Sequence, residues 1–157
     1  MPVTIGEKAP NFSLYNTDKI KMNLSDVEGK NVVLLFFPLA FSSVCTKEMC
    51  DVRDNISAYN TANAQVFGVS VDSLYVLKKF KEDQSLTFTL LSDFNKEAAK
   101  AYDVLYETFP GFEMKGVSKR AAFVIDKQGL IQYAEVCASP GNLPDFDAIE
   151  QTLQKIN

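Results

Sequence analysis

Cys45 stands where the chain turns from an apolar strand into a helix. The apolar run of residues 32–37 is followed by a turn over residues 38–43, and helical periodicity begins directly after that turn. The first turn of a helix has backbone N–H groups without intrahelical partners and the positive end of the helix dipole, so it favours a thiolate over a thiol. This placement predicts a nucleophilic cysteine on a strand-to-helix corner.

The sequence contains no histidine, and this excludes several kinds of site. Cys-His and Ser-His-Asp nucleophile pairs cannot form, and neither can zinc sites with histidine ligands. A zinc site made by Cys45, Cys50 and Cys137 is weakly supported, because neither interval is that of a Cys-x-x-Cys pair. Any activation of a cysteine must come from arginine, lysine, backbone donors or a helix end.

Ionisation alone would not make Cys45 the nucleophile of an enzyme. An ordinary cysteine has a pKa of about 8.5 and is roughly 3% thiolate at neutral pH, so complete ionisation gains about 30-fold in reactivity. Enzymes accelerate reactions by about 10⁶-fold or more. Nearby donors must therefore stabilise a leaving group too, and the local candidates are the Ser42 hydroxyl and the N–H groups of Val44 and Cys45. A cation must come from elsewhere in the chain.

The composition indicates one globular domain over residues 1–157, long enough to bury roughly 70% of its unfolded surface. Hydrophobic residues make up 46% of the chain, and no apolar run approaches the roughly 18 residues that suggest a membrane span. The net charge of -4 argues against a nucleic-acid groove. The N-terminal residues lack the pattern of a secretory signal, so we expect a soluble cytoplasmic protein whose three cysteines serve chemistry rather than a disulfide framework.

Hydrophobic periodicity predicts an α/β domain with a mixed sheet, similar to a thioredoxin-like fold with an N-terminal hairpin. Residues 73–102 would be a strand and helix segment inserted into the minimal core. Residues 104–119 form a long segment of weak periodicity, of a kind that is often functional. The predicted strands cover residues 32–37, 65–71, 87–91, 121–125 and 130–136, and the main helices cover residues 44–60 and a stretch opened by Pro144.

The motif Pro38-x-x-x-Ser42-x-x-Cys45 resembles the Pro-x-x-x-(Thr/Ser)-x-x-Cys signature of peroxiredoxins, the thiol peroxidases of the alkyl hydroperoxide reductase class. The resemblance spans nearly the whole chain, and two short segments look closest to the E-type subgroup, which has a single peroxidatic cysteine. The segments that carry the family resemblance are residues 6–12, 69–72 and 119–126, and those that resemble the E-type subgroup are residues 37–41 and 143–146.

The resemblance implies a role for each residue of the site. Cys45 would be the peroxidatic nucleophile, Ser42 a hydrogen-bond partner of thiolate and peroxide, and Pro38 a shield. Arg120 would be the missing cation, and Glu48 would orient that arginine. The thiolate would take the terminal oxygen of hydrogen peroxide or an organic hydroperoxide and become a sulfenic acid, with no metal or organic cofactor. Thioredoxin, glutaredoxin or a low-molecular-weight thiol would be the reductant, and the resemblance implies a homodimer.

Cys50 lies five residues after Cys45, a separation that resembles the resolving cysteine of Q-type peroxiredoxins, also called bacterioferritin comigratory proteins. On an intact α-helix, a five-residue step places Cα atoms roughly 8 to 9 Å apart, beyond the roughly 7 Å limit for a disulfide. If Cys50 resolves Cys45, the first helical turn must unwind in every cycle. Cys137 departs from the resolving positions of the family, and we expect a buried inert thiol.

Simpler interpretations exist for each of these residues. Cys45 could be a small core residue, Pro38 a strand terminator and Ser42 only an N-cap. Arg120 could extend to solvent, and Glu48 could serve only the helix dipole. Two other functions stay open. A thiol-disulfide oxidoreductase acting on proteins is disfavoured by the four-residue gap between the cysteines, and a redox-sensing or chaperone-like module would need an exposed apolar tract that the sequence does not offer.

Overall fold

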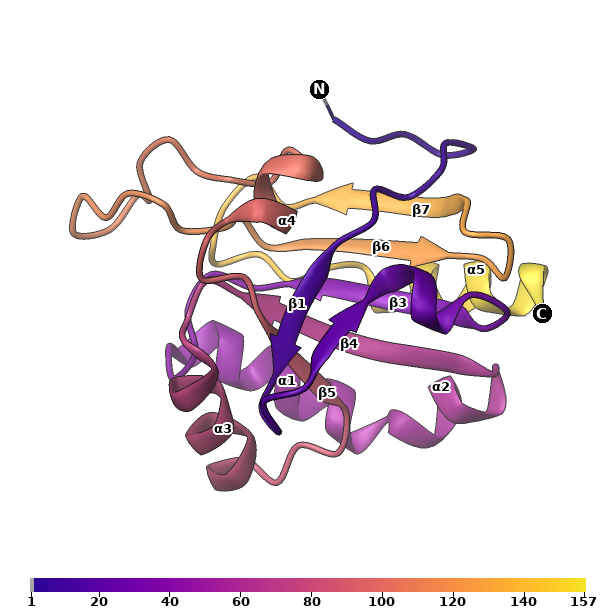
Figure 1. The fold of residues 1–157 in the computed structure, drawn as a ribbon, viewed down its shortest axis with the longest axis horizontal. Helices are drawn as coiled ribbons and strands as arrows, with labels where there is room; N and C mark the ends of the chain where they lie inside the picture. Colours follow the sequence, from indigo (N-terminus) through magenta and orange to yellow (C-terminus); the bar gives the residue numbers. More distant parts are fainter. Residues whose placement is uncertain (1) are drawn as a thin grey trace.

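The computed structural model describes residues 2–157, which form a seven-stranded sheet flanked by helices (Figure 1). The strands are β1 (Ser13–Asn16), β2 (Lys21–Asn23), β3 (Asn31–Phe36), β4 (Ala64–Ser70), β5 (Thr89–Ser92), β6 (Ala121–Ile125) and β7 (Ile131–Val136). The helices are the 3-10 helix η1 (Leu24–Val27), α1 (Ser43–Asp54), α2 (Ile56–Thr61), α3 (Leu74–Asp83), α4 (Glu97–Ala101) and α5 (Phe146–Ile156).

The sheet is mixed, in the order β2-β1-β5-β4-β3-β6-β7. The pairs β3–β4 and β4–β5 are parallel, whereas β6 pairs antiparallel with both β3 and β7. The hairpin of β1 and β2 joins the sheet through an antiparallel pairing of β1 with β5. These pairings confirm the predicted α/β fold with its mixed sheet and N-terminal hairpin. In the part of the chain that the structure describes, no helix is long and apolar enough to cross a membrane.

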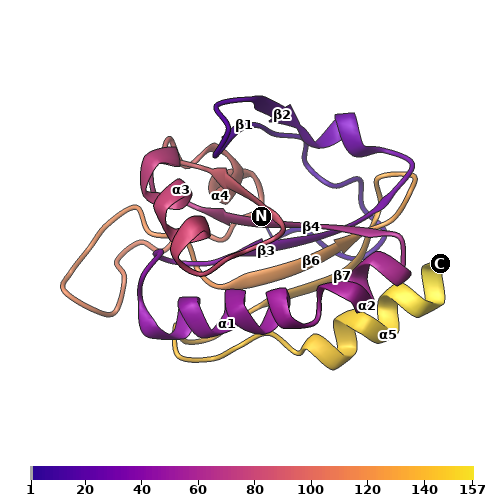
Figure 2. The ribbon, with the colours of Figure 1, turned by 90° about the horizontal axis from the view of Figure 1, so that it is seen from below.

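Strand β3 lies between β4 and β6 in the interior of the sheet, and all six of its residues are buried. Successive side chains of a strand point to opposite faces, so β3 contributes to two hydrophobic clusters. Val33 and Leu35 pack with α1, α3 and α5, and the neighbouring side chains of β3 pack with the hairpin and α4. Figure 2 shows α1, α2 and α5 on one face of strands β3, β4, β6 and β7, with α4 and the hairpin of β1 and β2 on the side of the other face.

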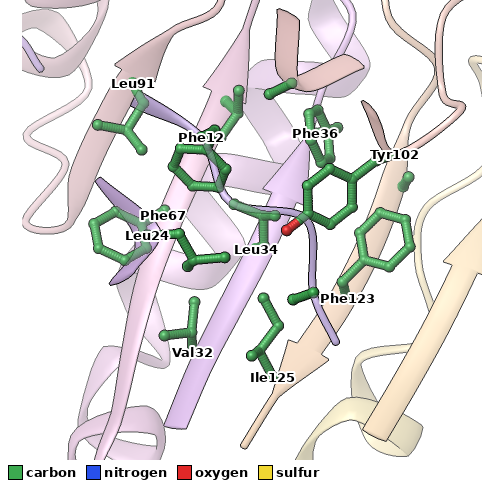
Figure 3. Close-up of a cluster of buried hydrophobic side chains, with 14 of the residues drawn as sticks. Phe12, Leu24, Val32, Leu34, Phe36, Phe67, Leu91, Tyr102, Phe123 and Ile125 are labelled. Carbon is green, nitrogen blue, oxygen red and sulfur yellow. The ribbon is translucent and has the colours of Figure 1, made fainter. Parts of the chain in front are cut away.

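The cluster on the hairpin side is rich in aromatic rings, as Figure 3 shows. Tyr102 lies at its centre, with its ring centroid 5.4 Å from that of Phe36 and 5.1 Å from that of Phe123. The Tyr102 hydroxyl donates to the carbonyl of Pro10 at 2.7 Å, so its polar end is satisfied. This cluster fixes the N-terminal segment onto β3, which ends beside the candidate site, and β6, which begins there.

The single helix predicted for residues 44–60 is wrong, because the chain breaks at Asn55 between α1 and α2. The Asn55 side chain donates to the carbonyl of Asp51 at 2.9 Å and so competes with the helical backbone bonding. Val52 and Tyr59 pack in one cluster on either side of the break, and for this reason the apolar periodicity continues through it.

Pro144 does not open the last helix as predicted. Helix α5 begins at Phe146, and the side chain of Asp145 caps it by accepting from the N–H of Ala148 at 3.0 Å. Residues 104–119 contain only an isolated bridge between Leu105 and Ser118, which agrees with the predicted long irregular segment.

Replacement of Gly68 by valine is expected to destabilise the fold, because Leu90 of the neighbouring strand β5 and Met49 of α1 pack closely against this position of β4. A Cβ at Gly68 would lie 2.7 Å from Leu90 Cδ2 and 3.3 Å from Met49 Sδ. Overpacking of this kind costs about 1–3 kcal/mol of unfolding free energy, which urea denaturation would measure. The matched control Gln65→Val, at a half-buried position of the same strand, should change it by less than about 0.5 kcal/mol. A loss in Gly68→Val no larger than in the control would contradict the prediction.

Candidate active site

The strand-to-helix corner ends β3 and starts α1. Phe37 still donates its N–H to Val69 at 2.9 Å, but Pro38 has no N–H and cannot continue the ladder. Ser42 is the N-cap of α1 in an extended conformation, and Cys45 lies in the first helical turn. The Cys45 side chain is 1% exposed and faces the sheet with Met49.

Arg120 reaches this corner because its strand is the neighbour of β3. Ala121, the first residue of β6, pairs with Phe36, the last residue of β3. The Arg120 side chain is 1% exposed, and its Nη2 lies 3.3 Å from Cys45 Sγ. Nη2 also donates to the carbonyl of Pro140 at 2.9 Å. The structure thus brings a cation to the cysteine from 75 residues away in the chain.

Glu48 pairs with Arg120 beneath the cysteine. Its Oε1 lies 2.6 Å from Arg120 Nη1, and the glutamate is 0% exposed. Position 48 follows Cys45 by three residues, so both side chains lie on one face of α1. The carboxylate therefore fixes one nitrogen of the guanidinium while the other nitrogen faces the sulfur.

The charges of this cluster depend on one another. Burial raises the pKa of Glu48 to about 7, although the positive charge of Arg120 works in the opposite direction. Burial acts to lower the pKa of Arg120, but Glu48 and Cys45 together raise it above its ordinary value. Arg120 is therefore a permanent cation, and it can stabilise negative charge on the sulfur and on an atom bound next to it.

Ser42 lies at the corner, but its hydroxyl does not bind Cys45. Its Oγ donates to the carbonyl of Leu39 at 2.7 Å, and within residues 2–157 no hydrogen bond joins it to the sulfur. The resemblance implied a contact with the thiolate, and the structure instead commits the hydroxyl proton to the turn. The lone pairs of Ser42 Oγ can still accept from a peroxide O–H. Pro38 is buried where β3 ends.

Cys50 is half-buried on the same helix but is not brought to Cys45. Its Sγ lies 3.4 Å from Gln84 Oε1, at the end of α3, and Arg53 donates to the Gln84 carbonyl. All three cysteines are free, and α1 is continuous through both Cys45 and Cys50. Resolution by Cys50 would therefore require a change in the helix.

Cys137 lies behind the site in the first residue after β7. Its N–H donates to the carbonyl of Arg120 at 2.9 Å, and its side chain is buried. Burial, followed by the charges of Glu135 and Glu48, raises the pKa of Cys137 to about 11. It is therefore a thiol rather than a thiolate at neutral pH, which makes it a poor nucleophile.

The sequence did not predict three groups that contact the site: the Pro140 carbonyl, the Gln84 amide and the carboxylate of Asp72. Asp72 Oδ2 accepts from the N–H of Ala40, inside the corner, at 2.8 Å. The position of Asp72 could have been predicted from the sequence. It follows β4, and the carboxyl ends of parallel strands such as β3 and β4 meet at one edge of a sheet. In the described residues, no group of three or more His, Cys, Asp or Glu side chains could hold a metal ion.

Replacement of Glu48 by glutamine is expected to reduce the pH dependence of stability. Because the pKa of Glu48 rises from 4.5 to about 7 on folding, the folded protein binds this proton more tightly than the unfolded chain. The free energy of unfolding should therefore fall as the pH rises from about 4.5 to about 7 and level off above. Urea denaturation across this range should show a smaller fall for Glu48→Gln than for the wild type. The exposed control Glu82→Gln should keep the wild-type slope, and equal slopes in all three proteins would contradict the prediction.

Comparisons with known proteins identify the family of the chain. The model of the AhpC/TSA family matches residues 5–134. A candidate peroxiredoxin of Mycobacterium tuberculosis strain CDC 1551 is 39% identical over 134 residues, which cover 85% of each chain. Peroxiredoxin Bcp of Escherichia coli K12 is 36% identical over 133 residues, which cover 84% of this chain and 85% of the relative.

The solved structure of peroxidoxin BcpB from Mycobacterium tuberculosis superposes with a TM-score of 0.86 at 27% identity and covers 99% of both chains. This confirms the thioredoxin-like fold of peroxiredoxin structures. Relatives named Bcp agree with the likeness to bacterioferritin comigratory proteins, whereas the E-type likeness of residues 37–41 and 143–146 stays an expectation. The chain belongs to the AhpC/TSA family and is a peroxiredoxin, a thiol-dependent peroxidase.

Proposed function

We propose that Cys45 is the residue through which this peroxiredoxin reduces hydrogen peroxide and organic hydroperoxides. The observation that carries the proposal is the 3.3 Å contact between Arg120 Nη2 and Cys45 Sγ, made inside the protein. In a site shielded from water, a fixed cation stabilises both the thiolate and the charge that develops on the peroxide oxygens. Arg120 thus supplies the cation that the residues around Cys45 lack.

The reaction is a displacement at the peroxide O–O bond. The Cys45 thiolate attacks the terminal oxygen, an S–O bond forms, and the O–O bond breaks. The leaving hydroxide or alkoxide takes up a proton and departs as water or an alcohol, and Cys45 becomes a sulfenic acid. The sulfur is oxidised and the peroxide is reduced by the same two electrons.

The neighbouring residues orient Arg120, bind the peroxide and shield the sulfur. Glu48 orients the guanidinium through its 2.6 Å contact with Arg120 Nη1. Ser42 accepts from the O–H of the peroxide, because its own proton is committed to Leu39. Pro38 shields the sulfur side of the corner. The N–H groups of the first turn of α1 add the positive end of the helix dipole.

Rapid mixing of the reduced protein with hydrogen peroxide tests this function. The wild type should react at least about 10³-fold faster than a free thiol, because enzymes exceed uncatalysed rates by such factors or more. Cys45→Ser should lose the reaction, while Cys137→Ser should keep it, since its buried thiol has a raised pKa. A wild-type rate no faster than that of a free thiol would contradict the proposed function.

We further propose that Cys50 resolves the sulfenic acid. The Cys50 sulfur attacks the sulfur of oxidised Cys45, an S–S bond forms, and the hydroxyl of the sulfenic acid leaves as water. An intact helix keeps the two Cα atoms too far apart, so the first turn of α1 must unwind. The half-buried position of Cys50, whose contact to Gln84 spans 3.4 Å, makes it available for this step.

Oxidation is therefore expected to loosen the start of α1. After one equivalent of peroxide, mass spectrometry should find a Cys45–Cys50 disulfide, and amide exchange at residues 44–50 should be faster than in the reduced protein. Cys50→Ser should instead retain a sulfenic acid at Cys45, with exchange at residues 44–50 slower than in the disulfide form of the wild type. Equal protection in the reduced and oxidised wild type would exclude this route of resolution, and Cys137→Ser should behave as the wild type.

A thiol reductant completes the cycle, and we propose thioredoxin, glutaredoxin or a low-molecular-weight thiol for this role. Each reduces the disulfide by thiol-disulfide exchange and releases Cys45 and Cys50. We also propose that the protein works in the cytoplasm, where its three free cysteines stay reduced between turnovers. The family resemblance supports a homodimer as its working form.

A further inference from the structure

The carboxylate of Asp72 binds the backbone of the turn that carries Ser42. Its Oδ2 accepts a 2.8 Å hydrogen bond from the N–H of Ala40 and a 2.7 Å hydrogen bond from Ser70 Oγ. Ser70 is 0% exposed. The Asp72 N–H donates to Ser70 Oγ at 3.2 Å, and its carbonyl accepts from Ser92 Oγ at 2.6 Å. The carboxylate is therefore held rigidly where it meets the turn.

One peptide unit connects this carboxylate to the Ser42 hydroxyl. The C=O of Leu39 and the N–H of Ala40 belong to the same planar trans unit, so they point in opposite directions. Asp72 binds the N–H on one side, and the carbonyl on the other side accepts from Ser42 Oγ at 2.7 Å. A rotation of this unit would break both hydrogen bonds at once. Asp72 thus fixes the direction in which the Ser42 hydroxyl donates.

The turn needs such an anchor because its next residue has a disfavoured backbone conformation. Phe41 has a φ of 70°, in the left-handed region that residues with a side chain rarely adopt. Its ring packs edge-on against Phe80 with centroids 5.1 Å apart, yet the residue is 49% exposed. A strained segment persists only where surrounding contacts hold it. The hydrogen bond from Ala40 to Asp72 ties the turn to the end of β4. The N–H and the hydroxyl of Ser42 both donate to the Leu39 carbonyl within the turn, at 3.4 and 2.7 Å.

We propose that Asp72 is a positioning residue of the peroxide site, acting on Ser42 through the Leu39–Ala40 peptide. While the Ser42 proton is committed to Leu39, the oxygen offers only lone pairs to the O–H of the hydroperoxide. Without Asp72 the peptide unit can turn, and the hydroxyl is free to donate to water instead. This inference rests on the proposed function, in which Ser42 accepts from the peroxide, and deepens it.

A double-mutant cycle with Asp72→Ala and Ser42→Ala tests the proposal. The readout is the second-order rate constant of the reduced protein with hydrogen peroxide. Asp72→Ala should lower this rate constant roughly ten- to a hundredfold when Ser42 is present, as expected for losing a charged hydrogen bond. In the Ser42→Ala background the same change should cost less than about twofold, because Asp72 acts through the hydroxyl. Asp72→Asn keeps an acceptor for Ala40 and should restore the rate to within about threefold.

Asp126→Ala is the matched control, because the Asp126 carboxylate also binds backbone N–H groups, those of Gln128 and Leu130, in another turn. Its rate constant should equal that of the wild type. Equal losses from Asp72→Ala in both backgrounds, or no loss in either, would overturn the proposal. If Asp72→Ala does not fold, Ser70→Ala removes the second partner of Oδ2 in the same cycle. A loss confined to the protein with Ser42 then supports the proposal, and any other result overturns it.

Failure of the proposed function would look different. In that case the wild type itself would react with peroxide no faster than a free thiol, and this inference would fall with it. Failure of the inference alone would leave a fast wild type whose rate depends on Ser42 and Asp72 independently. Urea denaturation of every variant separates a change of rate from a loss of folded protein.

Discussion

The buried guanidinium of Arg120 is the interaction on which the rest of the structure depends. A cation taken out of water costs several kcal/mol unless ion pairs and hydrogen bonds compensate for the lost hydration. Arg120 is 1% exposed and finds three acceptors: the Glu48 carboxylate, Cys45 Sγ and the Pro140 carbonyl. These belong to α1 and to the segment after β7, so the fold must bring both to the beginning of β6.

One guanidinium contacts two partners in this cluster, the Glu48 carboxylate and Cys45 Sγ. Burial raises the pKa of Glu48 to about 7, although the positive charge of Arg120 works in the opposite direction. In the proposed reaction the sulfur loses its negative charge when it becomes a sulfenic acid. The contact that holds Cys45 against Arg120 then weakens, which favours release of the first helical turn at the step that needs it.

The sequence predicts what is local and leaves out what depends on three-dimensional pairing. The corner from Pro38 to Cys45 lies within one short segment, so its strand, turn and helix follow from apolar periodicity and its chemistry from the motif. Arg120 could be assigned only through the family resemblance, because nothing in the residues themselves states that β6 pairs with β3. The break at Asn55 was hidden by the apolar stripe that runs across it. Asp72 contacts the turn at Ala40, and Pro140 lies in the loop after β7. The shapes of turns and loops cannot be predicted from hydrophobic periodicity.

The position of the two cysteines on α1 decides which of them moves. Helix α1 begins at Ser43, so Cys45 lies in the first turn, where the N–H groups have no helical partners to lose. Cys50 lies in the interior of the helix, and its release would break hydrogen bonds on both sides. Unwinding from the N-terminus also costs little burial until Cys45 itself is reached, because Ser42 and Ser43 are exposed. The cost lies in the hydrogen bonds of Thr46 to the Ser42 carbonyl, the burial of Cys45 and its contact with Arg120. In the proposed reaction, oxidation weakens that last contact. In the proposed resolution, Cys45 would therefore move to Cys50, while Cys50 and the rest of α1 would stay in place.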